Sequence, residues 1–203
     1  MTTRASLRLA LRRRLEDTAV PSVWDDDTLN DALASATRDY SARFPVQRTA
    51  TVVVAAGSRT LPLTAATQSG GRIVRVSDGR GETVPRNWSD GDAPPGSQQW
   101  RWWEGTIRLD QPAAAGSWRV EYLATRPLPS NDVDAVEVRD GDESIVVAMA
   151  ALYALHRRAV EDGKRGHSPT LILKTATAIR LDIEREIRSR MRQVRAGVLP
   201  AAG

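Results

Sequence analysis

Residues 20–45 constrain the fold most, because they combine a helix start, an apolar stripe and a helix stop in one short segment. Each of three consecutive aspartates, Asp25 to Asp27, can cap the free amides of a helix N-terminus. Pro45 prevents the helix from continuing. Between these signals, apolar residues recur at steps of four, three and four on one helical face; they are Leu29, Leu33, Ala36 and Tyr40. The segment predicts the second arm of a helical hairpin whose first arm is residues 3–16.

After Pro45 the helical period disappears, and alternating residues with turn formers take over from 48 to 124. Residues 49–54 alternate as a strand, and Gly57 and Ser58 favour a turn toward residues 59–63, which predicts a first hairpin. Residues 72–76 predict another short strand. Residues 90–97, DGDAPPGS, are so rich in turn formers that they predict a surface loop.

A second hairpin is predicted around Glu104 and Gly105, because residues 99–103 and 106–110 flank this pair symmetrically. A two-residue turn there sets the register of the two strands. It places large apolar side chains opposite each other on one face; the expected pairs are Trp100 with Leu109 and Trp102 with Ile107.

The other face of this hairpin combines like charges with an aromatic ring. The same register sets Arg101 opposite Arg108 beside Trp103, which is unfavourable unless a carboxylate or a partner lies nearby. Glu121 on the following strand is one candidate for that carboxylate. Arginine next to an exposed aromatic residue is also typical of an interface centre.

The helical period returns after residue 131. An acidic start precedes residues 145–155, which are apolar on every side and therefore predict a central helix. A turn is expected over residues 162–169. A long apolar stripe then predicts a last helix with Arg180, Glu184 and Arg188 on its solvent side; its members are Ile172, Ala176, Ile179, Ile183, Ile187, Met191, Val194 and Val198.

The order of elements predicts an α+β fold, a four-helix bundle of two N-terminal and two C-terminal helices with an inserted antiparallel β domain. Insertion into a bundle is tolerated where the two junctions lie close in space. The expected segments are a helical hairpin at 1–45, the β domain at 46–130, two C-terminal helices at 131–196 and a flexible tail at 197–203.

Composition excludes several classes of function. The chain has no cysteine, so disulfides and thiolate metal sites are impossible, and a reducing, intracellular assembly site is the natural expectation. The longest apolar run, residues 145–155, is shorter than the ~20 residues that span a bilayer. The net charge of +4 comes from 29 basic and 25 acidic residues that are spread along the chain. This distribution disfavours a nucleic-acid binder, which usually concentrates positive charge on one face.

No set of residues indicates catalysis. His156 is expected at the end of the apolar helix, and His167 with Ser168 lies in a loop without an evident orienting acid. The sequence GKRG at 163–166 lacks the phosphate-loop spacing. Asp25 to Asp27 lack the alternating spacing of a calcium loop. We therefore expect no enzyme activity, no cofactor and no metal.

The chain resembles head-to-tail connector (adaptor) proteins of tailed bacteriophages. In that family a helix of the form LRxxLRRxLxD precedes a tryptophan, an acidic cap and a helix that ends in aromatic residues and proline. The matching residues here are 7–17, Trp24, Asp25 to Asp27, and Tyr40, Phe44 and Pro45. Larger members, similar to tail tubular A or gatekeeper proteins, carry a β insert before an alanine-rich helix and a charged last helix. Residues 145–156 and 170–195 resemble those two helices.

This resemblance implies a virion protein that is assembled in the host cytoplasm and has no catalytic role. It implies a homo-oligomeric ring, a dodecamer, that docks under the portal protein, extends its channel and gives the tail or a tail-completion protein a platform. Non-specific contact with DNA in the channel is possible, and no membrane is involved. In related adaptors the C-terminal segment commonly reaches toward the portal.

Several residues are candidates for such interfaces. The N-terminal arginines could pair with the acidic stretch at 132–143 between subunits. The candidate interface residues are Arg4, Arg8, Arg12, Arg101, Trp103, Arg108, Arg188, Arg192, Arg195, Val198, Leu199 and Pro200. Three other functions stay open: a head completion or tail terminator protein, a nucleic-acid-binding accessory protein that uses residues 185–195, and an enzyme of unrecognised type.

Overall fold

The computed structural model describes residues 2–63, 72–87 and 97–196, with the side chains of 191–196 left out. The chain divides into two compact units. Both ends of the chain, residues 1–43 and 126–203, form a helical unit, and residues 44–125 form a β unit. The fold is α+β, with two N-terminal and two C-terminal helices and a central antiparallel region, as predicted.

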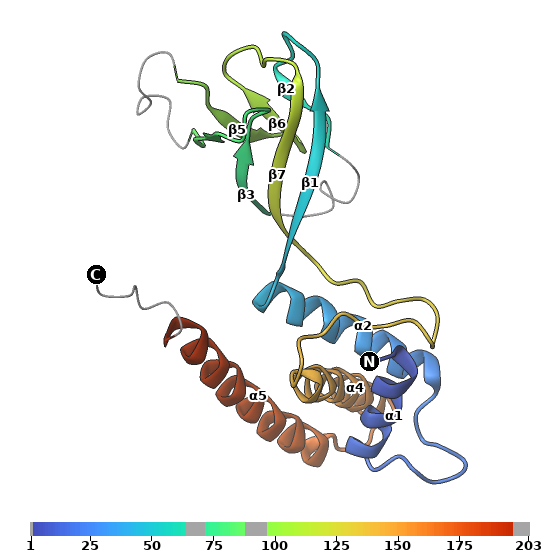
Figure 1. Ribbon diagram of the computed structural model, residues 1–203. Coiled ribbons are helices and arrows are strands. Elements are labelled where there is room, and N and C mark those ends of the chain that lie inside the picture. The colour runs from blue at the N-terminus through green and yellow to red at the C-terminus, as the bar shows by residue number, and fades with distance from the viewer. Residues whose placement is uncertain (1, 64–71, 88–96, 197–203) are drawn as a thin grey trace. The chain divides into compact units, whose positions relative to one another are not determined.

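The helical unit contains α1 (Arg4–Arg14), α2 (Asp26–Arg43), α4 (Glu143–Lys164) and α5 (Thr170–Ala196) (Figure 1). Asp25 caps α2: its carboxylate accepts hydrogen bonds from the Thr28 amide at 2.6 Å and the Thr28 hydroxyl at 2.9 Å. These bonds hold the pKa of Asp25 below its usual value. The predicted apolar stripe of α2 is confirmed, because Leu29, Leu33, Ala36 and Tyr40 are all buried.

Helix α4 is the centre of this unit, and it packs against α1, α2 and α5. Every residue from Ile145 to Ala151 is buried, which confirms the helix predicted to be apolar on all sides. The buried alanines of α4 have small side chains, so α1, α2 and α5 can all pack closely against this helix. Helix α4 runs to Lys164, so the predicted position of His156 at its end is wrong: His156 is exposed and lies two turns before the last residue.

Helix α5 uses its predicted stripe to pack on α4. Ala176, Ile183 and Ile187 are buried. The residues expected on its solvent side, Arg180, Glu184 and Arg188, do not all interact with one another as the spacing suggested. Glu184 pairs with Arg43 of α2 at 3.0 Å, and Arg188 donates to the backbone oxygen of Glu184 at 3.1 Å. Glu184 therefore links α5 to α2 through an ion pair and is not only a solvent-facing residue.

The described strands of the β unit form two antiparallel sheets. The four-stranded sheet has the order β1-β7-β3-β4, and the three-stranded sheet has the order β2-β6-β5. Their strands are β1 (Val46–Val54), β2 (Thr60–Leu61), β3 (Arg72–Ser77), β4 (Thr83–Val84), β5 (Trp100–Trp103), β6 (Thr106–Leu109) and β7 (Gly116–Ala124).

The first predicted hairpin is wrong, because its two strands join different sheets. Strand β1 pairs along its whole length with β7, whereas β2 pairs with β6. The turn at Gly57, which has a φ of +81°, carries the chain from one sheet to the other. Val54 of β1 and Leu61 of β2 are both buried in one core. Strands β1 and β2 are thus associated through apolar side chains that they bury in a common core, and they do not pair with each other through backbone hydrogen bonds.

The second predicted hairpin has the expected register. Trp100 lies opposite Leu109, and Trp102 lies opposite Ile107. Glu104 and Gly105 have φ values of +48° and +76°, the left-handed pair that a tight two-residue turn requires. The segment 90–97, predicted to be a loop, lies outside the described residues except for Ser97.

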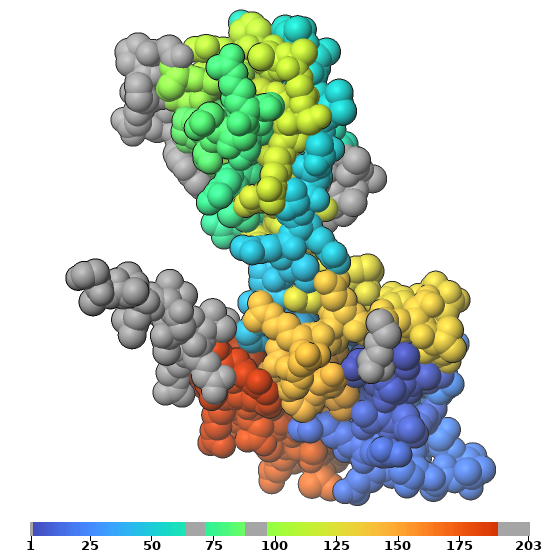
Figure 2. All heavy atoms as spheres, viewed as in Figure 1, coloured from blue at the N-terminus to red at the C-terminus, as the bar shows by residue number. Residues whose placement is uncertain are grey.

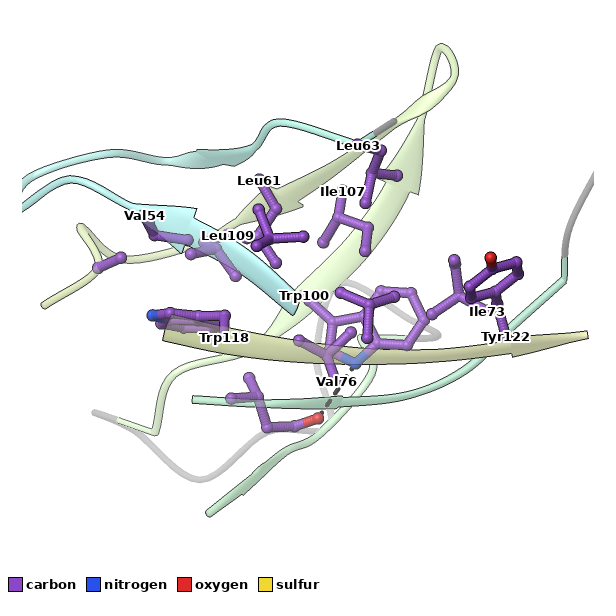
Figure 3. Close-up of a cluster of buried hydrophobic side chains, with 14 residues drawn as sticks. Val54, Leu61, Leu63, Ile73, Val76, Trp100, Ile107, Leu109, Trp118 and Tyr122 are labelled. Atoms are coloured by element: carbon purple, nitrogen blue, oxygen red, sulfur yellow. Dashed lines mark hydrogen bonds between the residues drawn. The ribbon is translucent and has the colours of Figure 1, made fainter. Parts of the chain in front are cut away.

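The core of the β unit lies between the inner faces of the two sheets (Figure 3). Trp100 and Trp118 are the largest side chains in it, and both are almost fully buried. The indole nitrogen of Trp100 donates to the backbone oxygen of Val84 at 3.1 Å, so the polar atom of this ring is paired. This core keeps the outer face of the β5–β6 hairpin in a defined position.

Candidate functional site

The N-terminal arginines form ion pairs within one chain. Arg4 contacts Asp132 at 2.7 Å, and Arg8 binds the same carboxylate through both oxygens at 2.9 and 2.6 Å. The pKa of Asp132 falls to about 2, first because of the bond from Arg8 and then because of the bond from Arg4. The same bond raises the pKa of Arg8. Arg4 and Arg8 therefore contact the acidic stretch in the same subunit, whereas the sequence suggested contacts between subunits.

Backbone contacts strengthen this clamp between the N-terminus and the segment that precedes α4. The amide of Ala5 donates to the oxygen of Asp132 at 3.1 Å, and the amide of Val136 donates to the oxygen of Thr2 at 2.8 Å. Further along, the Thr2 hydroxyl donates to the Glu143 carboxylate at 2.8 Å. Residues 132, 136 and 143 thus hold the N-terminus in place.

We expect the Asp132 clamp to make stability depend on pH in the acid range. The folded state lowers the pKa of Asp132 from 3.8 to about 2, so this contribution is complete above pH 3.8 and is lost as the pH falls toward 2. Asp132→Asn should lower the urea midpoint at pH 6, and its difference from the wild type should shrink toward pH 2. Asp140→Asn, at an exposed aspartate of the same stretch, is the control and should run parallel to the wild type. Parallel curves for Asp132→Asn would contradict the clamp.

The α1–α2 loop, residues 15–25, is held by one buried carboxylate. The side chain of Asp17 is 2% exposed and accepts hydrogen bonds from the amides of Val23 at 2.6 Å and Trp24 at 3.2 Å. Arg12 bonds to Asp17 at 2.5 Å and to the oxygen of Trp24 at 2.9 Å. Arg12 also pairs with Asp26 at 2.6 Å. Arg12, like Arg4 and Arg8, is therefore engaged within its own chain.

This ordered loop exposes apolar side chains. Val20 is 97% exposed and Val23 is 66% exposed, although the amide of Val23 is bonded to the buried Asp17. The interpretation of the sequence missed both residues, because two valines in a loop carry no pattern. The order of the loop becomes evident only in the structure, where the buried carboxylate of Asp17 binds the amides of Val23 and Trp24.

The outer face of the β5–β6 hairpin has the predicted composition. The guanidinium groups of Arg101 and Arg108 lie 5.6 and 5.9 Å from the centre of the Trp103 ring, which is 48% exposed. Attraction between a cation and the ring face offsets part of the repulsion between the two arginines. The expected role of Glu121 is wrong: it contacts Arg75 and Arg119 of the other sheet. Glu104 is the carboxylate near Arg108, at 3.8 Å.

The C-terminal candidates are only partly visible. Arg188 lies on α5, and this helix continues through Arg192 and Arg195, whose side chains are not described. Val198, Leu199 and Pro200 lie outside the described residues. Within the visible part of residues 185–195, Arg185 pairs with Asp182 at 3.4 Å and Arg190 with Glu186 at 3.7 Å. Carboxylates thus interrupt the positive surface that a nucleic-acid function would need.

A polar network links α2, α4 and α5 within the helical unit. The hydroxyl of Tyr40 donates to Asp142 at 2.6 Å, and Arg190 lies 3.7 Å from the same carboxylate. Burial, with this hydrogen bond, raises the pKa of Tyr40 to about 12. Arg126 stacks on the Tyr40 ring at 5.2 Å. The network joins α2, α4 and α5 at the point where the chain returns from the β unit.

A small cavity of about 130 Å³ lies among α2, α4 and α5 and contains His156. Its acids are engaged, because Asp39 accepts a hydrogen bond from Tyr153 and Glu184 pairs with Arg43. In the α4–α5 turn, Ser168 bonds to the hydroxyl of Thr170 at 2.9 Å. Among the described residues, no group of three or more His, Asp or Glu is arranged to hold a metal ion.

The Arg101–Trp103–Arg108 face combines two cations with a half-exposed aromatic ring, a composition that is frequent in interfaces. In the described part of the chain, no helix combines the length and the apolarity needed to cross a membrane. A family model described as SU10 adaptor protein matches residues 2–199, which is nearly the whole chain. No curated protein sequence matches the chain significantly.

Proposed function

The chain belongs to the SU10 adaptor protein family, whose members are structural adaptors of bacteriophage particles, and from this premise we propose that it forms a ring between the portal and the tail. The ring docks under the portal protein, extends its DNA channel and gives the tail or a tail-completion protein an attachment platform. The observation that carries the proposal is the match over residues 2–199, which includes both the helical unit and the β unit.

The construction of the helical unit supports a role in assembly. The Asp132 clamp fastens α1 to the segment that precedes α4, so this side of the helical unit has a defined surface. Closed rings require two different complementary patches on each subunit. The exposed valines of the α1–α2 loop and the Arg101–Trp103–Arg108 face are surfaces of the kind that interfaces use.

The proposal includes finer features that rest on the resemblance to the larger adaptors with a β insert, of the tail tubular A or gatekeeper kind. These features are a dodecameric ring, assembly in the host cytoplasm, contact between the channel wall and DNA, and docking of residues 198–200 on the portal. We further propose that the Arg101–Trp103–Arg108 face contacts another virion protein, since Trp103 is half exposed between two cations.

The decisive experiment is the imaging of particles made without this protein. We expect DNA-filled heads that lack tails, and we expect added purified protein to restore tail attachment. The control is a preparation that lacks a tail protein, in which the ring should remain visible on the heads. Normal, tailed virions in the absence of the protein would contradict the proposed function.

A further inference from the structure

Helix α5 has an outer face that no other element of the described structure covers. This outer face consists of Leu171, Lys174, Ala178, Leu181 and Arg185, at steps of three, four, three and four. Such spacing places the five residues in one straight stripe along the helix. Leu171 is 77% exposed and Leu181 is 51% exposed, whereas Ala176, Ile183 and Ile187 on the opposite side are buried against α4. The stripe is therefore available for another helix or loop.

The α1–α2 loop is the second unpartnered apolar feature of the helical unit. Val20 and Val23 are largely exposed, and the amides of Val23 and Trp24 donate hydrogen bonds to Asp17, which anchors the C-terminal part of the loop. A loop that is already ordered loses little conformational entropy when it binds. Exposed apolar residues on a fixed loop are thus better suited to an interface than the same residues on a mobile loop.

The charges of the two features are complementary. The segment from residue 15 to 27 holds five carboxylates and no basic residue. Arg12 and Arg8 neutralise two of them, Asp17 and Asp26, and the remaining acids include the exposed Asp27. The outer face of α5 instead carries Lys174 and Arg185, although Arg185 also pairs with Asp182 at 3.4 Å. The exposed acid Asp27 of the loop and the exposed base Lys174 of the stripe are therefore of opposite charge, and both features also expose apolar side chains.

The two features also lie on different sides of the same unit. In Figures 1 and 2 the α1–α2 loop is at one edge of the helical unit and α5 is at the opposite edge, with α4 between them. Within one subunit α4 separates the loop from α5, so the loop cannot contact the stripe of its own chain unless α4 leaves the centre of the unit. Two complementary patches on opposite sides of one subunit produce a head-to-tail contact, and this contact closes into a ring if the rotation allows it.

We propose that the α1–α2 loop of one subunit docks on the outer face of α5 of the next copy of this chain, an inference that rests on the proposed ring. Val20 and Val23 lie between the leucines of the stripe, and the acids of the loop face Lys174 and Arg185. The contact joins identical chains, so the same pair of surfaces repeats around the ring.

Cysteine cross-linking in assembled particles tests this contact, because the natural chain has no cysteine to react. The double variant Val23→Cys with Leu181→Cys, treated with a short bismaleimide, should form a ladder of bands at multiples of 22.2 kDa. Each single variant should stay monomeric. The matched control is Val23→Cys with Val53→Cys, since Val53 is 77% exposed on β1, and it should give no ladder.

The possible results separate the contact from the proposed function. A ring that is visible by electron microscopy but shows no ladder would overturn the contact and leave the adaptor function intact. Cross-linking of Val23→Cys to a different virion protein would contradict the proposal that the loop binds a second copy of this chain. Particles mixed from the two single variants give a second readout: they should contain cross-linked dimers, and their absence would also count against the contact.

Discussion

Trp100→Ala is expected to destabilise the β unit by about 3–5 kcal/mol, the usual cost of removing a large aromatic side chain from a packed core. Trp100 is 2% exposed and lies between the two sheets (Figure 3). The substitution also leaves the Val84 oxygen without its indole donor and removes the ring on which Arg86 stacks at 5.1 Å. The cavity and the lost hydrogen bond both lower the stability of the β unit.

Urea unfolding with two probes measures this effect. Five of the six tryptophans lie between residues 44 and 125, so fluorescence reports mainly on the β unit, whereas ellipticity at 222 nm reports mainly on the helices. With a slope of about 1–1.5 kcal/mol per molar urea, the fluorescence midpoint should fall by at least ~2 M. The helical signal should change much less.

The matched control is Trp103→Ala, because Trp103 is the same residue type in the same strand. It is 48% exposed, and the guanidinium groups of Arg101 and Arg108 lie over its ring. We expect its loss to cost less than ~1 kcal/mol. Equal shifts for the two variants would show that Trp100 is not the centre of the core.

Asp17→Ala is the second substitution with a large expected effect. It removes the buried carboxylate that accepts two backbone amides and pairs with Arg12. Breaking a buried ion pair by removing one partner costs about 3–5 kcal/mol, because the other charge stays buried without compensation. Here Arg12 keeps Asp26, so we expect a loss of about 3 kcal/mol, at the lower end of that range.

Hydrogen exchange and thermal unfolding should detect this loss. The amides of Val23 and Trp24 should lose their protection first, because each has Asp17 as its acceptor. Asp31→Ala is the control, since Asp31 also pairs with an arginine, Arg157 at 3.1 Å, but is 75% exposed. An exposed pair contributes about 0–1 kcal/mol. Similar losses of stability for both variants would contradict the structural role of Asp17.

Periodic features of the sequence were sufficient to predict much of the fold. The stripe at Leu29, Leu33 and Tyr40 and the apolar run from Ile145 appear as buried helix faces in the structure. The register of Trp100 opposite Leu109 was predictable because a two-residue turn leaves no freedom in the pairing of its strands. Each of these predictions depends on residues only a few positions apart.

The candidate surfaces were predictable only as far as residue type and local register determine them. Arg101, Arg108 and Trp103 could be placed together because they share one hairpin. The partner of β1 could not be predicted, because β7 is more than sixty residues away and many strands have a similar alternating pattern. Likewise, nothing in the acidic stretch distinguishes Asp132, which binds two arginines, from the exposed Asp140.

The sequence by itself therefore determined the order of the four described helices, the apolar faces of α2 and α4, and the register and tight turn of the β5–β6 hairpin, since these follow from periodicity and backbone geometry. The tertiary structure alone decided which charges meet. It directs Arg4 and Arg8 to Asp132 in the same chain and buries Asp17 beneath a loop that exposes Val20 and Val23. The physical reason is that an ion pair between distant segments depends on how the whole chain packs, and a local pattern contains no information about that packing.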